Sequence, residues 1–126
     1  MPMRLNHVAL AVTDRDASAE FYGRHFGLTE RVHDDAHLLI LGDGHGSLLA
    51  LSDVTDPGTT PGHLPRTTHF GFEADTADEV LAARERFAAD GVTETEFEGE
   101  NPYGAPVRVQ VLDPDGYRVE IYAYAY

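Results

Sequence analysis

An internal repeat constrains this sequence more than any other feature. Residues 6–30 and residues 68–94 each begin with a polar residue and a histidine, continue through a short apolar stretch into a helix-like stretch, and end in Gly-(Leu/Val)-Thr-Glu. The two histidines, His7 and His69, are 62 residues apart (69 − 7), which is close to half of the 126-residue chain. A repeat with this period predicts that one supersecondary unit has been duplicated.

The first copy predicts a strand, a helix and three further strands. The alternating apolar stretch 5–12 is typical of a strand, and Thr13-Asp14-Arg15-Asp16 resembles a capping box with the Thr13 hydroxyl at the helix cap. Gly27 suits the left-handed position that ends a helix. The remaining strands are expected at about 28–33, 37–42 and 47–52.

The second copy predicts the same elements in the same order. A strand is expected over 67–74, followed by a helix that is capped by Thr76 and ended by Gly91. The remaining strands are expected at about 92–98, 106–112 and 117–124.

Between the copies, residues 53–66 contain three prolines and two glycines and predict a linker. The expected fold class is therefore α+β, with two βαβββ modules, about 4–52 and about 67–124, that form a curved mixed sheet with a cleft. We expect the whole chain, 1–126, to be a single domain.

The composition excludes several classes of function. The chain has no cysteine, which excludes disulfides, thiol nucleophiles and iron–sulfur clusters. Its 22 Asp and Glu residues outnumber its 9 Lys and Arg residues, so its formal net charge is −13. Because such a chain repels phosphate backbones and anionic lipids, we expect no nucleic-acid and no membrane partner. No apolar run is long enough to span a bilayer and no signal peptide is apparent, so we expect a cytoplasmic location.

Side chains alternate along a strand, so each predicted strand has a bulky apolar face and an opposite face. In the first strand Val8 and Leu10 suit the face that packs on the helix, whereas His7 is followed on the other face by small residues. His69 stands in the equivalent place in the second copy. The polar side chains expected on the cleft face are those of His7, His69, Arg108, Gln110, Glu120 and Tyr122.

Two imidazoles and one carboxylate suit a divalent first-row metal ion. Any one of these residues alone is more typical of a hydrogen-bonded residue at the edge of a core, so the hypothesis rests on the equivalent placement of His7 and His69. The counterpart of Glu120 in the first copy is expected near Ala50, which cannot bind a metal. The face also offers three candidates for orienting an anionic or phenolic substrate, which are equally compatible with simple solvation of the sheet. These candidates are Arg108, Gln110 and Tyr122.

Three segments together resemble the vicinal oxygen chelate superfamily, the group of glyoxalase I, bleomycin resistance proteins, fosfomycin resistance thiol transferases, methylmalonyl-CoA epimerase and extradiol dioxygenases. The resemblance covers nearly the whole chain, and its most specific part is Asp113-Pro114-Asp115-Gly116-Tyr117-Arg118-Val119-Glu120. The other segments are Asn6–Val12, leading to Phe21-Tyr22 and Phe26-Gly27-Leu28, and Thr68–Phe72.

The resemblance implies a paired βαβββ fold around a metal cleft, usually completed by a second subunit, so we expect a homodimer. It implies that His7, His69 and Glu120 hold a divalent ion (Fe, Mn, Ni, Co or Zn) and that Glu120 takes part in catalysis. The implied activity is chelation of two neighbouring oxygens of a small oxygen-rich substrate, with Lewis-acid stabilisation of an enolate or oxyanion.

Departures from the family pattern leave the reaction open between lyase, isomerase, dioxygenase and thiol transferase. Glyoxalase I-like sites usually have a fourth ligand where this chain has Ala50, and the epimerase is disfavoured for the same reason. Fosfomycin transferases usually have a threonine in place of Ala9 and a Ser-rich potassium loop in place of residues 99–104. The dioxygenases share the triad, but their acid–base residues have no clear match. The alternative is a metal-free protein that binds a small molecule or a cationic drug, as bleomycin resistance proteins do.

Overall fold

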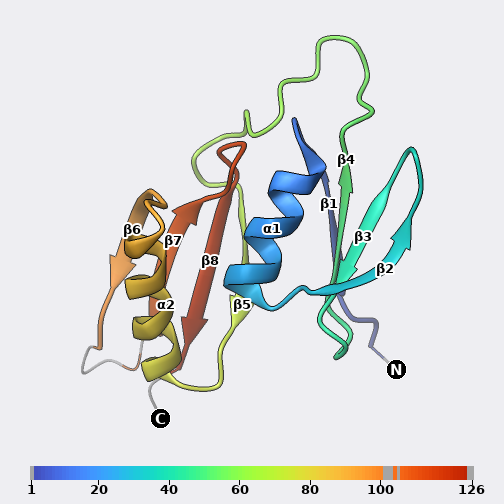
Figure 1. Ribbon diagram of the computed structural model, residues 1–126. Coiled ribbons are helices and arrows are strands. Elements are labelled where there is room, and N and C mark those ends of the chain that lie inside the picture. The colour runs from blue at the N-terminus through green and yellow to red at the C-terminus, as the bar shows by residue number, and fades with distance from the viewer. Residues whose placement is uncertain (1, 101–103, 105, 125–126) are drawn as a thin grey trace. The chain divides into compact units, whose positions relative to one another are not determined.

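A computed structural model describes residues 2–100, 104 and 106–124 of the chain (Figure 1). The chain divides into two compact units, residues 1–62 and residues 63–126, which we call module one and module two. The boundary lies within the predicted linker 53–66. That the two modules act as a single domain stays a prediction, and part of the loop 99–104 lies outside the described residues.

Module one is a four-stranded mixed sheet with one helix. Its strand order is β1-β4-β3-β2, with β1 parallel to β4 and the other neighbours antiparallel (Figure 1). The elements are β1 (His7–Ala11), α1 (Arg15–Phe26), β2 (Glu30–Asp34), β3 (Leu39–Gly42) and β4 (Leu48–Ser52).

Module two repeats this topology. Its strand order is β5-β8-β7-β6, again with one parallel pair, β5 and β8, and two antiparallel pairs. The elements are β5 (His69–Glu73), α2 (Ala77–Ala89), β6 (Glu94–Glu98), β7 (Val107–Leu112) and β8 (Arg118–Ala123). The α+β class and the two βαβββ modules predicted from the sequence are therefore confirmed.

The strand registers repeat between the modules as well as the strand order. In each module, the second residue after the strand-initial histidine lies opposite one residue of the parallel neighbour: Ala9 opposite Ala50, and Gly71 opposite Glu120. The expected equivalence of positions 50 and 120 thus holds at the level of backbone pairing. Even the irregularities repeat, because β2 and β6 each have a register shift, between Arg31 and His33 and between Glu94 and Glu96.

The helix caps explain where each helix begins and ends. The carboxylate of Asp14 accepts hydrogen bonds from the amides of Asp16 (3.0 Å) and Ala17 (3.1 Å), so Asp14 and not the predicted Thr13 is the cap of α1. The prediction erred by one residue because a carboxylate can serve two unpaired amides of the first turn, and Asp ranks above Thr as a cap. The predicted end holds, since Gly27 adopts φ 73°.

In α2 the predicted cap is confirmed, because the Thr76 hydroxyl accepts a hydrogen bond from the amide of Glu79 (3.2 Å). The apolar faces of the sheets form the buried interior as predicted: Leu10 in module one and Val109 and Val119 in module two are at most 8% exposed. The opposite faces are left for polar side chains.

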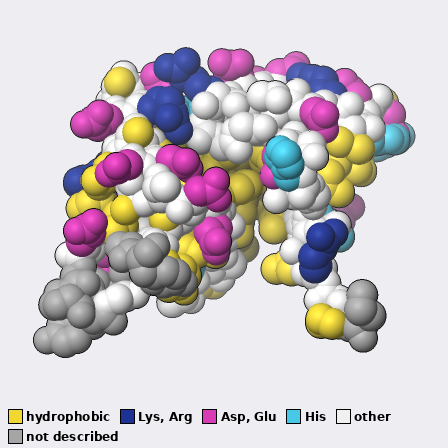
Figure 2. Space-filling model, turned by 90° about the horizontal axis from the view of Figure 1, so that it is seen from below, with side chains coloured by type: hydrophobic (Ala, Val, Ile, Leu, Met, Phe, Trp, Pro, Cys, Tyr) yellow, Lys and Arg dark blue, Asp and Glu magenta, His cyan; other side chains and the backbone are white. Residues whose placement is uncertain are grey.

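The described surface is acidic, and Figure 2 shows Asp and Glu side chains spread over the visible face. None of the helices in the described part of the chain is long and apolar enough to cross a membrane.

Candidate metal centre

His69 is positioned at the first residue of β5 with its ring held by the backbone. Its Nδ1 lies 3.1 Å from the carbonyl oxygen of Thr67. Because a carbonyl can only accept a hydrogen bond, Nδ1 carries the hydrogen and donates it, and in the neutral form of the ring Nε2 has the lone pair. This is the form in which histidine binds metals, and donation of the second ring N–H to a carbonyl is the usual way in which such a ligand is oriented.

The free nitrogen of His69 faces the carboxylate of Glu120. The distance from Nε2 of His69 to Oε2 of Glu120 is 3.8 Å, and the Glu120 side chain is only 13% exposed. A neutral imidazole nitrogen and a carboxylate oxygen on neighbouring strands are a donor pair that fits a divalent first-row metal ion.

Gly71 makes room for this carboxylate. It lies opposite Glu120 in the register of β5 and β8, and a Cβ at this position would lie 3.3 Å from Oε2 and 3.5 Å from Cβ of Glu120. A side chain at position 71 would therefore press on the carboxylate oxygen that faces His69.

His7 occupies the equivalent place at the start of β1 in module one. Its side chain is exposed, and its Nδ1 lies 3.2 Å from Oδ1 of Asn6. The amide oxygen, like the Thr67 carbonyl, accepts a hydrogen bond from Nδ1, which leaves Nε2 as the metal-binding nitrogen. The two predicted histidine ligands thus share a tautomer as well as a place in the repeat.

The structure brings together two of the three predicted ligands, His69 and Glu120, within module two. Within either module, the described residues contain no group of three or more His, Asp or Glu side chains that could hold a metal ion. That His7 joins the other two stays a prediction.

Arg108, on β7, is surrounded by carboxylates. Its Nη1 donates to Oε1 of Glu120 (2.8 Å) and to Oε2 of Glu96 (3.1 Å), and its Nε donates to Oε2 of Glu98 (3.2 Å). Burial by itself lowers the pKa of the Arg108 guanidinium, but the hydrogen bonds from these three carboxylates outweigh it and raise the pKa. Arg108 is therefore a permanent cation inside an acidic cluster.

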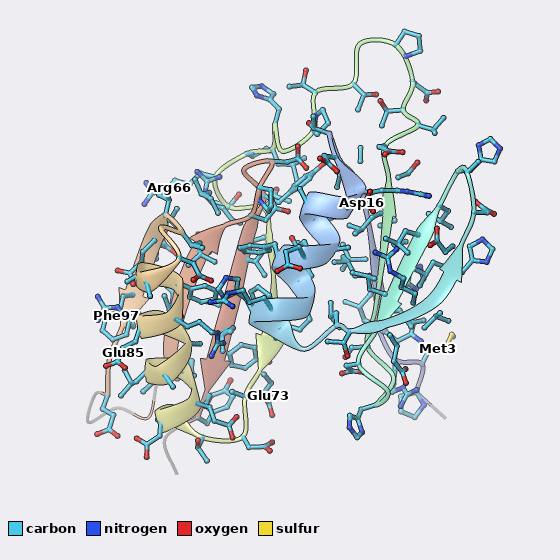
Figure 3. All side chains as sticks on the ribbon, in the orientation of Figure 1. Met3, Asp16, Arg66, Glu73, Glu85 and Phe97 are labelled. Atoms are coloured by element: carbon cyan, nitrogen blue, oxygen red, sulfur yellow. The ribbon has the colours of Figure 1, made fainter. Side chains whose placement is uncertain are left out.

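The other two predicted substrate-binding residues already have protein partners. Gln110 is 3% exposed, and its Oε1 accepts a hydrogen bond from the Thr95 hydroxyl (2.9 Å). Burial raises the pKa of the Tyr122 phenol, and the negative charge of Glu73 and a hydrogen bond to it raise the pKa further. Figure 3 shows Glu73 at the end of β5. Substrate binding by Arg108, Gln110 and Tyr122 stays a prediction.

Sequence reasoning missed the residues that orient the predicted site. Asn6 and Thr67 hold the histidine rings. The only sign of this role in the sequence is that Asn6 lies one residue before His7 and Thr67 lies two residues before His69. Glu96 and Glu98 hold Arg108, and their signal is the acidic strand Glu94-Thr95-Glu96-Phe97-Glu98. At the edge of this cluster, Arg66, labelled in Figure 3, lies 3.8 Å from Glu96.

Module one has a hollow on the sheet face that carries His7. Its volume is about 310 Å³, and its floor is formed by small residues of β1 and β4, including Ala9, Ala11 and Ala50. Leu38 and residues 54–56 line its side. Ala50, the counterpart of Glu120, therefore lines this hollow with a short side chain that cannot bind a metal ion.

Comparison with known proteins identifies the family. Residues 4–121 match the model of the Glyoxalase/Bleomycin resistance protein/Dioxygenase superfamily, and this chain belongs to that superfamily. A trivalent organoarsenical cleaving enzyme from Bacillus sp. (strain MD1) is 30% identical over 125 residues, which covers 95% of this chain and 73% of the relative. The resemblance found in the sequence is thereby confirmed.

Two solved structures are similar over nearly the whole chain. Lactoylglutathione lyase from Agrobacterium tumefaciens is 28% identical, with a TM-score of 0.72 over 98% of this chain and 95% of that chain. The fosfomycin resistance protein FosX from Listeria monocytogenes, in complex with Mn(II) and sulfate, is 20% identical, with a TM-score of 0.77 over 98% of this chain and 91% of that chain.

Proposed function

We propose that this protein is a divalent-metal-dependent enzyme that acts on a small substrate with two neighbouring oxygen atoms. The observation that carries the proposal is the pairing of Nε2 of His69 with Oε2 of Glu120 at 3.8 Å, with the other nitrogen of the imidazole bonded to a backbone carbonyl. His7 is the third ligand in this proposal, because it repeats the placement and the tautomer of His69. The Mn(II) bound by FosX supports a divalent ion in this fold.

In this site the protein would act mainly by binding and orienting. A divalent ion bound there would supply Lewis-acid stabilisation of negative charge on the substrate oxygens. His69 and His7 would each bind through Nε2 while their Nδ1 atoms keep the rings in place. Glu120 would bind through Oε2, because its Oε1 is engaged by Arg108. Three protein ligands leave coordination positions for two substrate oxygens.

The reactions of the relatives do not carry over directly. Ala50, which holds in module one the register position that Glu120 holds in module two, provides neither a fourth ligand nor a second carboxylate, which disfavours a reaction that moves a proton between two carboxylates. Trivalent arsenic is a soft centre that favours thiolate ligands, and this chain has no cysteine to provide one. The proposal therefore specifies the metal and the chelating substrate, with the reaction class open between lyase, isomerase, dioxygenase and thiol transferase.

Metal titration tests the proposal. We expect the purified protein to bind one equivalent of Mn, Fe(II), Co, Ni or Zn per chain and to melt at a higher temperature with the metal bound. The variants H69A and E120Q should each lose more affinity than the roughly 10- to 100-fold that removal of a residue orienting a ligand usually costs, because a ligand itself is removed or weakened. The variant H63A, which removes an exposed histidine in the linker, is the matched control and should bind as the wild type does. No bound metal and no change in melting temperature with any of these ions would contradict the proposal.

A second candidate function is favoured by the hollow of module one. A hollow of about 310 Å³ with a floor of alanines, on a chain with a net charge of −13, suits a small cationic molecule that is bound without catalysis. Calorimetric titration with bleomycin-type compounds tests it in the absence of metal. Binding heat that the variant A50L abolishes would favour this function, and no heat with any cationic compound would remove it.

A further inference from the structure

The contacts of Arg108 differ from those expected of a substrate anchor. Among the described residues it contacts three carboxylates of its own module, and its side chain is only 22% exposed. Its Nη1 is shared between Glu120 and Glu96, and its Nε is bonded to Glu98. Arg108 is thus engaged on both sides of its guanidinium fork, and the surrounding carboxylates would repel an anionic substrate.

We propose that Arg108 is a positioning residue for the metal-binding carboxylate of Glu120. The inference rests on the proposed function, since it assigns Arg108 a task at that site. Nη1 of Arg108 bonds Oε1 of Glu120 at 2.8 Å, and the other oxygen, Oε2, is the one that faces Nε2 of His69. The arginine thereby selects which carboxylate oxygen is presented to the ion and makes that ligand monodentate.

The acidic strand β6 holds the arginine in turn. In the register of β6 and β7, Glu98 lies opposite Arg108 and Glu96 lies opposite the next residue on the same face, Gln110. Because a guanidinium is a rigid planar fork, bonds at Nε and Nη1 fix its plane as well as its position. Outer ligands of this kind usually change metal affinity by 10- to 100-fold when they are removed.

The second module alone can build this arrangement. The residue opposite Ile40 in β4 is Ala50, just as the residue opposite Gln110 in β8 is Glu120. By the same register, the position of Arg108 corresponds to Leu38. Module one therefore has neither the carboxylate nor the arginine, which agrees with a metal site whose carboxylate comes from module two.

Two roles for Arg108 predict opposite signs when its charge is removed. If the arginine acts only as a cation close to the site, its removal relieves repulsion of the metal ion, and the ion binds more tightly. If it positions Glu120, its removal frees the carboxylate to rotate or to pair elsewhere, and the ion binds more weakly. The sign of the change in metal affinity therefore decides between the two roles.

The experiment measures Mn(II) affinity by calorimetry for the full chain and its variants. We expect R108Q to raise the dissociation constant by about 10- to 100-fold and R108K, which keeps one hydrogen-bonding cation, to raise it less. The matched control is R84Q, because Arg84 also pairs with a glutamate of β6, Glu94 (2.7 Å), but lies on α2. R84Q should bind Mn(II) as the wild type does. The visible spectrum of the Co(II) form should change in R108Q, since it reports the ligand set.

The outcomes are separable from the test of the proposed function. A wild-type protein that binds no metal contradicts the proposed function, and this inference falls with it. A wild-type protein that binds Mn(II), together with an R108Q variant of equal or higher affinity, overturns the inference alone. If R108Q does not fold, the R108K variant tests the inference instead. An R108K variant that binds Mn(II) with the same affinity as the wild type would then overturn the inference.

Discussion

At the scale of single residues, the glycine at position 71 links the sheet to the candidate metal site. An added Cβ would lie 3.3 Å from Oε2 of Glu120, so the variant G71A should displace this oxygen by a few tenths of an ångström. We expect Mn(II) affinity to fall by about 10-fold, at the low end of the effects of residues that orient ligands. The stability of the metal-free protein should change little, because the close contact of the new Cβ with Glu120 opposes the gain of about 0.5–1 kcal/mol from replacing a glycine in a strand.

Calorimetry and thermal melting measure these two effects separately. The control is G99A in the same module, where the part of the chain that the structure describes offers the new Cβ only the Phe97 ring, at 3.7 Å. A G71A variant with unchanged metal affinity would show that Gly71 has no part in placing Glu120.

Tyr122 allows a test of the electrostatics of the same sheet face. Burial raises the pKa of its phenol above 10, and the charge of Glu73 and the hydrogen bond to it raise the pKa further. Since the pKa of Tyr122 is higher in the folded state than in the unfolded state, Tyr122 contributes to the free energy of unfolding below pH 10. This contribution is lost as the pH rises through the pKa of the folded state. The variant E73Q should lower the pKa of Tyr122 only part of the way, because burial remains.

Absorbance at alkaline pH measures the phenolate form of the six tyrosines. The variant Y122F identifies the part of the titration that belongs to Tyr122, which we expect at a higher pH than for an ordinary tyrosine. An unchanged titration in E73Q would contradict the assigned role of Glu73.

At the scale of secondary structure, one glycine within helix α1 and another at its C-cap should respond to alanine with opposite signs. Gly23 lies within the helix, and an added Cβ would make only ordinary contacts, at 3.6 Å from the Leu28 carbonyl oxygen. G23A should therefore stabilise the protein by about 0.5–1 kcal/mol. Gly27 ends the helix at φ 73°, so G27A should destabilise it by about 1 kcal/mol.

Chemical denaturation of the two variants measures both values with the wild type as reference. A stabilising G27A, or a G23A that is destabilising by more than the error of the measurement, would contradict this account of the helix.

The same scale shows how far the sequence could predict the structure. Alternation placed His69 and Glu120 on one face because both strands are regular, and the repeat identified Ala50 as the counterpart of Glu120. The predicted cap of α1 was wrong by one residue because Thr13 and Asp14 are both good cap residues. Only the hydrogen-bond geometry shows which of the two caps the helix. That His7 joins the other two ligands stays a prediction.

The carboxylates around Arg108 could not be predicted in the same way. β6 has a register shift between Glu94 and Glu96, so these two residues point to opposite faces although they are two positions apart. Glu94 bonds Arg84 on the helix side, whereas Glu96 bonds Arg108 on the other side. Simple alternation would have placed Glu94, Glu96 and Glu98 on one face, so the acidic strand indicated an acidic face but not which of its glutamates hold Arg108.

At the scale of the whole molecule, the two modules have equal topology but unequal polar faces. In module two the face carries a histidine, an arginine and several carboxylates, whereas in module one it carries His7 and a hollow with a floor of alanines. The difference is clearest at the equivalent register positions, where module one has Ala50 and module two has Glu120.

The expected homodimer is the last prediction at this scale, and the N-terminal segment of module one supports it. Met3 and Leu5, which precede β1, are 99% and 93% exposed, and Met3 is labelled in Figure 3. Such apolar side chains lose contact with water when a second copy covers them, at roughly 25 cal/mol per Å² buried. The net charge of −13 on each copy opposes association, and salt weakens that repulsion.

We therefore expect a dimer at micromolar concentration in about 150 mM salt, where the screening length is about 8 Å, and a shift toward monomer as the salt is removed. The double variant M3S/L5S should shift the equilibrium toward monomer at the higher salt, whereas V54S, which changes an exposed residue of the linker, should not. Light scattering across a salt series measures both effects. A wild-type monomer at every salt concentration would contradict the dimer, and a dimer that M3S/L5S leaves intact would show that the interface lies elsewhere.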